Sequence, residues 1–316
     1  MTYRLKKTFD DISKLSFEDQ NQLLDLINPM IDIKLKSEKK KTNVNERFRN
    51  LTHLSIFTRK ILGMHVKSIL VNSENGLFAV DPEDCVVGYE LRKKGRYGQR
   101  EIAIIKNFIN SRSKILIVGA HIGTLAIPIS KLSLKTYAIE ANPSTYELLS
   151  INVSLNGLTN CFPINIAAGD KSEYIRFLQN TVNSGGSKRK PKIENLMYTY
   201  DEPEEITVKS EPLDDFLTEK EFDVIIMDLE GSEYFALKGM QKLLYHTKVL
   251  IMEFIPHHLK NISSVSVDDL LELLNMFDYM TIPSKEIKVA KENFSKVLNW
   301  MFENEEIDDG IIFEKK

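Results

Sequence analysis

The chain has 316 residues, of which 42% are hydrophobic and 28% charged, so it can bury the core of one large domain with an accessory segment. Its net charge of −3 argues against a dedicated duplex-binding protein, which normally presents a strongly basic face. Cys85 and Cys161 are isolated thiols without metal-ligand spacing, as expected in a reducing compartment. The N-terminus lacks a signal-peptide core and no apolar run is long enough to span a bilayer, so we expect a cytoplasmic protein without a membrane span.

The first third of the chain is mixed in character. Apolar residues at helical spacing predict a helix within residues 1–33, and residues 34–49 carry an excess of lysine and arginine. Residues 68–80 alternate like a β-hairpin with an Asn-Gly turn, and 92–100 is a second basic stretch. We expect residues 1–110 to form a helical and hairpin extension that serves as a lid, as an oligomer contact or on the substrate side.

A strand, turn and helix signal begins at Lys114, where a continuous apolar run leads into Gly119 and Gly123. Such a run bounded by glycine is typical of a buried strand in a parallel sheet, whose first turn often holds a ligand. Strands and helices then alternate, which predicts a mostly parallel α/β sheet with helices on both faces over residues 111–316. The polar segment 180–205 is predicted to be a substrate-covering loop. The predicted core strands are 114–118, 136–140, 162–168, 223–228 and 248–253, and a last strand is expected at 311–313.

The spacing of Gly119 and Glu140 indicates nucleoside binding. Glu140 ends the second predicted strand 21 positions after Gly119, where a carboxylate can accept the hydroxyls of a ribose. The middle glycine of a dinucleotide fingerprint is replaced by His121, and no phosphate-binding G-x-x-x-x-G-K-[ST] motif occurs. These features favour S-adenosylmethionine, while tight strand-to-helix packing is the alternative explanation of the turn itself.

Three acidic side chains end predicted strands and are expected to meet at one edge of the sheet, namely Glu140, Asp228 and Glu253. Methyl transfer to a hydroxyl requires alignment and a base. We expect Asp228 or Glu230 to be that base, although Asp228 can equally cap the following helix. Glu253 is expected to be structural or to position the substrate. His257 and His258 are alternative bases or simply solvated residues, and no metal site is expected.

The chain resembles the FkbM-type S-adenosylmethionine-dependent methyltransferases between about Phe78 and Tyr279. The resemblance implies a class I methyltransferase fold, with a seven-stranded sheet whose last strand is antiparallel, and commonly O-methylation of a sugar or secondary-metabolite hydroxyl. It implies cofactor contacts at Gly119, Gly123, Glu140 and Asp170, and we also expect Ala120, His121, Asn142, Ala168 and Asp228 to contact the cofactor. The motifs that carry it are Val118-Gly119-Ala120-His121-Ile122-Gly123, Glu140-Ala141-Asn142-Pro143, Asn152 with Leu155-Asn156, Ala167-Ala168-Gly169-Asp170, Leu213-Asp214-Asp215, Met227-Asp228-Leu229-Glu230-Gly231-Ser232-Glu233 and Leu237-Lys238-Gly239.

The chain departs from the family pattern at three positions. Family members usually carry Asp at the position of Ile117 and Asn at that of His121, and often Lys at that of Ile226. The Asp helps to hold the amine of the cofactor, and Glu101 on the preceding helix is a possible substitute.

Three functions are compatible with the sequence. The first is an O-methyltransferase for a small-molecule or glycan hydroxyl, with homo-oligomerisation left open. The second is an RNA 2′-O-methyltransferase, suggested by the basic stretches, although no aromatic-rich basic face accompanies them and nucleic acid is not the expected partner. The third is a non-catalytic binding protein whose cofactor site has degenerated at Ile117.

Overall fold

The computed structural model describes residues 44–316, and the chain divides into two compact units between Lys67 and Ser68. The helix expected within 1–33 lies outside the described residues. In the first unit, the helix α3 spans Val44–Leu62 and includes the end of the first basic stretch. Gly63 follows the helix with a positive φ of 86°, and Arg59 donates a 2.6 Å hydrogen bond to the carbonyl of Val66.

The second unit begins with the predicted hairpin, which was grouped with the N-terminal extension. Its strands are β1, Ile69–Ser73, and β2, Gly76–Val80, which pair antiparallel. The helices α4, Val87–Lys94, and α5, Gln99–Ile105, follow. Within residues 44–316, none of the helices combines the length and the apolar character needed to cross a membrane.

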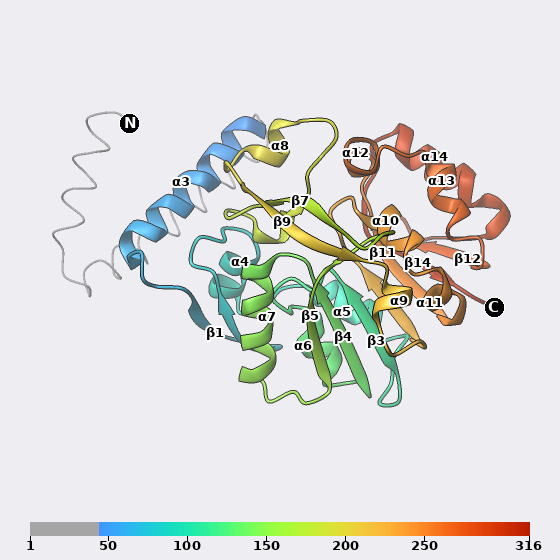
Figure 1. Ribbon diagram of the computed structural model, residues 1–316, viewed down its shortest axis with the longest axis horizontal. Helices are drawn as coiled ribbons and strands as arrows, with labels where there is room; N and C mark the ends of the chain where they lie inside the picture. Colours follow the sequence, from blue (N-terminus) through green and yellow to red (C-terminus); the bar gives the residue numbers. More distant parts are fainter. Residues whose placement is uncertain (1–43) are drawn as a thin grey trace. The chain divides into compact units, whose positions relative to one another are not determined.

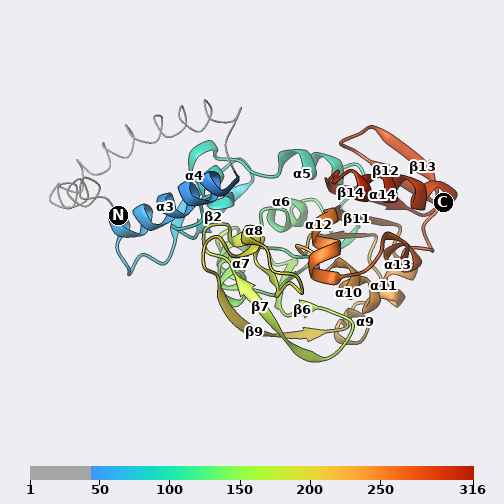
Figure 2. The ribbon, with the colours of Figure 1, turned by 90° about the horizontal axis from the view of Figure 1, so that it is seen from above.

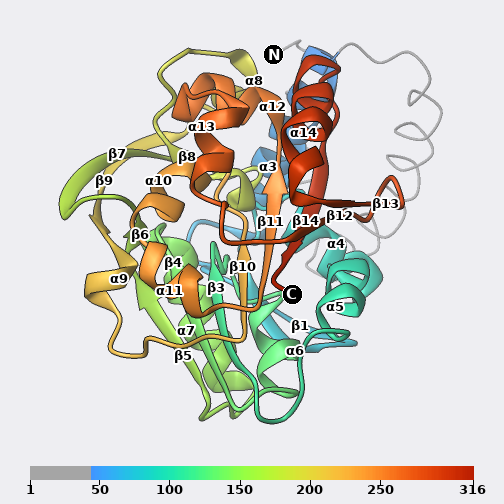
Figure 3. The same ribbon diagram turned by 90° about the vertical axis from the view of Figure 1, so that its right-hand side faces the viewer.

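An eight-stranded sheet forms the centre of the second unit. Five strands are parallel in the order β5-β4-β3-β10-β11, and β14 then runs antiparallel between β11 and β12 (Figures 1 and 3). The antiparallel last strand was expected, but the sheet has eight strands instead of seven, because β13 folds back as a hairpin on the edge strand β12. The strands are β3 Lys114–Val118, β4 Lys135–Glu140, β5 Cys161–Asn165, β10 Val224–Met227, β11 Val249–Phe254, β12 Tyr279–Ile282, β13 Ile287–Ala290 and β14 Asp308–Glu314.

Helices cover both faces of this sheet, as the sequence predicts. Along β3, Ile115 and Ile117 pack on one face, whereas Leu116 and Val118 pack on the other, because successive strand residues point to opposite sides. Figure 2 shows α5 and α6 on one side of the sheet and α10 and α11 on the other. The first face is covered by α5, α6 (Ala126–Ser130) and α7 (Pro143–Leu155), and the second by α9 (Leu213–Phe216), α10 (Glu233–Lys238), α11 (Gln241–His246), α13 (Val267–Glu272) and α14 (Phe294–Glu303).

A second sheet of four strands includes parts of two segments that the sequence predicts differently, the strand 162–168 and the loop 180–205. The expected strand 162–168 is split: β5 ends at Asn165, whose amide donates to the carbonyls of Glu140 and Ala141, and the chain then enters another sheet. The predicted loop 180–205 is also partly regular, since it contains a 3₁₀ turn, the strand β8 and the short helix α8, Leu196–Thr199. The second sheet has the order β6-β9-β7-β8, with β6 at Ala167–Ala168, β7 at Glu173–Gln179, β8 at Lys188–Arg189 and β9 at Glu204–Glu211.

Asn152 of α7 and Asn156, the residue that follows α7, join this helix to the hairpin. The buried Asn152 accepts a 2.6 Å hydrogen bond from the amide of Ala79 and donates to the carbonyls of Ala79 and Ile122. Asn156 makes the same pair of bonds with the backbone of Leu77. The side chains therefore act as a substitute for a neighbouring strand along β2.

We expect Asn152→Ala to lower the free energy of unfolding by about 2–4 kcal/mol, because three buried backbone groups lose their partner. Chemical denaturation measures this change. Asn156→Ala, at the partly exposed end of the same helix, is the matched comparison and should cost less. Equal, small losses in both variants would contradict the structural role assigned to Asn152.

Candidate active site

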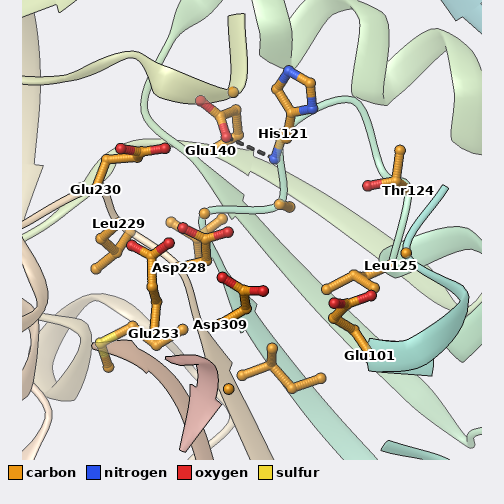
Figure 4. Close-up of a pocket in the computed structure, with 18 of the residues that line it drawn as sticks. Glu101, His121, Thr124, Leu125, Glu140, Asp228, Leu229, Glu230, Glu253 and Asp309 are labelled. Carbon is orange, nitrogen blue, oxygen red and sulfur yellow. Dashed lines mark hydrogen bonds between the residues drawn. The ribbon is translucent and has the colours of Figure 1, made fainter. Parts of the chain in front are cut away.

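A cavity of about 460 Å³ lies at the carboxyl ends of β3, β4, β10 and β11 in the second unit. This volume and position are typical of ligand sites in parallel α/β sheets. Its floor is the turn after β3, and its walls come from the loops after the other strands (Figure 4). Side chains that line it include Tyr97, Glu101, His121, Thr124, Glu140, Ile175, Phe177, Ser184, Asp228, Glu230, Glu253 and Asp309.

The turn after β3 lies unusually close to the loop after β10. A Cβ atom at Gly119 would lie 1.7 Å from the carbonyl oxygen of Asp228, and Gly119 has a φ of 88°. Glycine is the residue that tolerates both conditions. The amide of Asp228 donates a 3.0 Å hydrogen bond to the carbonyl of Val118, so the two loops are joined at the point where they border the cavity.

Glu140 ends β4 and is held by the backbone on both sides. The amide of His121 donates to its Oε2 and the amide of Asn142 to its Oε1, each at 2.8 Å. His121 reaches this position with a φ of 50°, in the left-handed region. Burial raises the pKa of Glu140 to about 7, against the lowering effect of these two hydrogen bonds. Glu140 lines the cavity, and because a carboxylate has about four acceptor sites it can accept further hydrogen bonds there.

A loop from the second sheet covers the same end of the cavity. Its 3₁₀ turn, Ser184–Gly186, lies over His121, whose Nε2 is 2.7 Å from the Ser184 hydroxyl, and that hydroxyl donates to the buried carboxylate of Asp84. Burial lowers the pKa of His121 to about 4, so the ring is neutral at pH 7. Asn142 holds the other end of the loop through the hydroxyl of Ser187.

Two carboxylates at the far end of the cavity have strongly raised pKa values. Asp228 is open to solvent on the cavity side, yet enclosure by the protein, and then the charge of Glu230, raise its pKa well above the ordinary value. Burial and the nearby charge of Asp228 do the same to the pKa of Glu253. Figure 4 shows Asp228, Glu253 and Asp309 around this part of the cavity, with Glu101 across from them. A carboxyl group with a raised pKa is suited to accept a proton near neutral pH.

Glu230 differs from these groups because it has a charged partner. Its Oε2 lies 2.9 Å from the Nζ of the buried Lys188 and 3.4 Å from the Nε2 of His258. Burial, and then the charge of Lys188, lower the pKa of His258 to about 2, so this ring carries no charge. The charge of Lys188 is therefore used in the ion pair with Glu230.

Nine of the predicted site residues line the cavity, and four do not. Gly123 packs against Leu149 beneath the turn, and the Asn142 side chain caps the start of α7. Asp170 pairs with Lys238 at 3.3 Å, and Nδ1 of His257 lies 2.9 Å from the Tyr198 hydroxyl. Those that line the cavity are Glu101, Gly119, Ala120, His121, Glu140, Ala168, Asp228, Glu230 and Glu253.

The alternative role of Asp228 as a helix cap has no support in the geometry. The residue at the start of α10 is Ser232, which makes no side-chain cap. Glu233 accepts from the amide of Leu229 at 2.8 Å and so binds the loop instead. The carboxylate of Asp228 therefore does not cap α10 and is available to a ligand in the cavity.

Several lining residues were missed by the sequence interpretation. Asp309 arrives on β14, and Ser184 on the loop of the second sheet. No local motif marks either residue, because both reach the cavity through pairings that are distant in sequence. The Asn-Ser-Gly-Gly composition around Ser184 was the one available signal, since it predicts a turn.

Two of the three departures from the family pattern, Ile117 and Ile226, lie on strands of the central sheet. Ile117 is buried within the sheet core and Ile226 lines the cavity as an apolar wall. Glu101 projects from α5 into the cavity (Figure 4), so a carboxylate is present near the turn although β3 supplies none. Within residues 44–316, the His, Cys, Asp and Glu side chains form no group that could hold a metal ion.

Comparison with known proteins places these features in a family. A family model described as the methyltransferase FkbM domain matches residues 118–303, and no curated protein matches the sequence. Among solved structures, FkbM methyltransferase from Methylobacillus flagellatus KT is 16% identical with a TM-score of 0.39, and the match covers 65% of this chain and 44% of that one. The M. jannaschii TYW2 structure in complex with AdoMet is 17% identical with a TM-score of 0.41, covering 79% of this chain and 87% of that one.

The chain thus spans less than half of the Methylobacillus protein. The family match covers more than half of the present chain and includes the Gly119 turn, Glu140 and the loop after β10. This protein therefore belongs to the FkbM methyltransferase domain family.

Proposed function

We propose that this protein is an S-adenosylmethionine-dependent methyltransferase that methylates a hydroxyl group of a sugar, glycan or secondary metabolite. The observation that carries the proposal is the position of Glu140, a backbone-held carboxylate at the end of β4 beside the glycine turn and on the wall of a 460 Å³ cavity. A ribose diol is the ligand group that suits such a carboxylate.

The residues of the cavity fit the cofactor. Glu140 has acceptor capacity left on both oxygens, and the apolar side chains of Ile175 and Phe177 form a wall suited to an aromatic base. Glu101 is placed to accept hydrogen bonds from the ammonium group in place of the missing aspartate at Ile117. When bound, S-adenosylmethionine supplies an electrophilic methyl group.

The protein's own contribution to transfer is alignment and proton removal. The turn at Gly119 and the loop at Asp228 are held together and border the same space. Asp228 accepts the proton of the hydroxyl, directly or through one water, because its raised pKa makes it basic enough near neutral pH. Glu230 is a weaker choice, since its charge is engaged with Lys188. An RNA acceptor is disfavoured, because the carboxylates around the cavity repel phosphates.

Glu140→Ala should weaken S-adenosylmethionine binding at least tenfold, since two charge-assisted hydrogen bonds contribute about 1.5–3 kcal/mol each. Isothermal calorimetry measures the change. Glu147→Ala, an exposed acid on α7, is the matched control and should bind normally. Unchanged affinity in Glu140→Ala would reject the ribose assignment.

Binding should also depend on pH through Glu140, whose pKa is about 7. The ionised form accepts both ribose hydroxyls, so affinity falls as the pH drops below about 7, by up to about tenfold per pH unit. Glu140→Gln removes this titration while keeping the shape of the side chain. Calorimetry from about pH 6 to about pH 8 compares the affinity of the two proteins for S-adenosylmethionine. The same pH dependence of affinity in both proteins would mean that Glu140 does not contact the ligand.

Asp228→Asn should retain the fold and most of the cofactor affinity while lowering kcat by about 10²–10⁴, the usual contribution of a positioned general base. Glu230→Gln should have a smaller effect. Release of S-adenosylhomocysteine with a panel of sugars measures turnover, and calorimetry measures cofactor binding separately. Near-normal turnover in both variants would move the base elsewhere, to Glu253 or His257.

A further inference from the structure

A short segment of the second sheet, residues 184–188, contacts three of the loops that border the cavity. The hydroxyl of Ser184 lies 2.7 Å from an imidazole nitrogen in the turn after β3, and the hydroxyl of Ser187 accepts a 3.2 Å hydrogen bond from an asparagine amide in the loop after β4. The last residue of the segment, Lys188, reaches the loop after β10. The segment that covers the glycine turn therefore also brings a lysine to the side of the cavity that contains Asp228.

The ammonium group of Lys188 is held in one place by two neighbours. Its Nζ lies 2.9 Å from Oε2 of Glu230 and 5.2 Å from the centre of the Tyr198 ring, which is the range of a cation–π contact. The hydroxyl of Tyr198 is bonded in turn to Nδ1 of His257 and to the amide of Asn261. The side chain of Lys188 is only 6% exposed, and a charge this deeply buried is costly unless it is paired. The ion pair therefore has a fixed geometry, which distinguishes it from pairs at the surface.

This ion pair holds the loop that carries Asp228 and Glu230. Glu230 has a φ of 52°, in the left-handed region that is costly for a residue with a side chain and persists where the surroundings fix it. Lys188 fixes its carboxylate, and the hydroxyl of Ser263 donates a 2.6 Å hydrogen bond to the carbonyl of the next residue, Gly231. Asp228 lies two positions before Glu230 on the same loop (Figure 4), so the ion pair also restricts the loop at the proposed base.

The charge of Lys188 also affects the ionisation of Asp228. Enclosure by the protein, and then the charge of Glu230, raise the pKa of Asp228, whereas the charge of Lys188 lowers it. A carboxyl group that stays protonated near neutral pH cannot accept the proton of an attacking hydroxyl. The groups near Asp228 are the acids Glu230, Glu233, Glu253 and Asp309, the phenol of Tyr97 and the ammonium group of Lys188. A positive charge among these acids therefore favours the form of Asp228 that can act as a base.

We propose that Lys188 is a positioning residue for methyl transfer, whose ammonium group fixes Glu230 and keeps the carboxylate of Asp228 ionised, so that Asp228 can remove the proton of the acceptor. The proposal rests on the proposed function, in which Asp228 is the base. Lys188 does not line the cavity. It therefore acts on the reaction through Asp228 and Glu230, without contacting the cofactor or the acceptor.

The test follows the titration of Asp228 in the full-length protein without added ligand, by NMR of isotope-labelled aspartate carboxyl carbons. The signal is identified by its loss in Asp228→Asn. Lys188→Met should move the midpoint of this titration up by about one pH unit or more, because the ionised form loses its cation. Lys188→Arg keeps the charge and should keep the midpoint. Lys190→Met is the matched control and should leave the midpoint unchanged, since Lys190 pairs with the exposed Glu205.

A second comparison is independent of whether Lys188→Met folds with Glu230 left unpaired. It sets the double variant Lys188→Met/Glu230→Gln, which has neither charge, against Glu230→Gln alone. The midpoint of Asp228 should again be higher by about one pH unit or more in the protein that lacks Lys188. An unchanged midpoint in this comparison, or an equal rise in Lys190→Met, would overturn the proposal.

The same displacement should appear in catalysis. With the sugar that is methylated fastest, Lys188→Met should lower kcat at about pH 7 by about tenfold or more, and kcat should recover as the pH rises, since a base with a higher pKa ionises later. An equal loss of kcat at every pH would show a purely structural role and would overturn the proposal. Absence of turnover with every sugar would count against the proposed acceptor class, and the titration of Asp228 would still decide on Lys188.

Cofactor binding separates this proposal from the proposed function. Because Lys188 does not line the cavity, Lys188→Met should bind S-adenosylhomocysteine within about threefold of the wild-type affinity in calorimetry. Failure of the wild-type protein to bind S-adenosylhomocysteine would reject the proposed function and would leave the Asp228 titration unaffected.

Discussion

The contact between the backbone at Gly119 and the carbonyl of Asp228 is the constraint on which the site depends. A Cβ atom at Gly119 would lie only 1.7 Å from that oxygen, so the two loops can approach this closely because the residue is glycine. This approach places Asp228 at the glycine turn, and the turn in turn presents the amide of His121 to Glu140. The ends of β3, β4 and β10 therefore meet at the cavity, and each of the three loops restricts the conformation of its neighbour.

The carboxylates of the cavity affect the stability of the folded protein. Carboxylates that lie close together in a partly enclosed space destabilise the folded protein when they ionise, as the raised pKa values of Asp228 and Glu253 indicate. Among them, Glu230 has a cationic partner in the buried Lys188. Ionisable groups with perturbed pKa values are common at the functional sites of proteins.

The second sheet covers the Glu140 end of the cavity through one of its loops. It begins where the chain leaves the central sheet after Asn165, and it returns through β9 to the helix α9. Its loop brings Ser184 between His121 and Asp84, so three segments that are far apart in sequence meet over the cavity. Differences between related proteins in such a segment can change what the cavity binds without altering the glycine turn.

The sequence by itself determined the buried strands, the glycine turn and the carboxylates at the strand ends. These features are local: an apolar run bounded by glycine forms a buried strand wherever it packs, and the last residue of a parallel strand reaches the ligand edge of the sheet. Glu140, Asp228 and Glu253 were therefore placed correctly at the cavity. Only the tertiary structure decided that the strand predicted at 162–168 divides between two sheets, that Lys188 pairs with Glu230, and that Asp309 and Ser184 join the cavity. Those outcomes depend on pairings between distant segments, such as β14 with β11, whose register no local periodicity encodes.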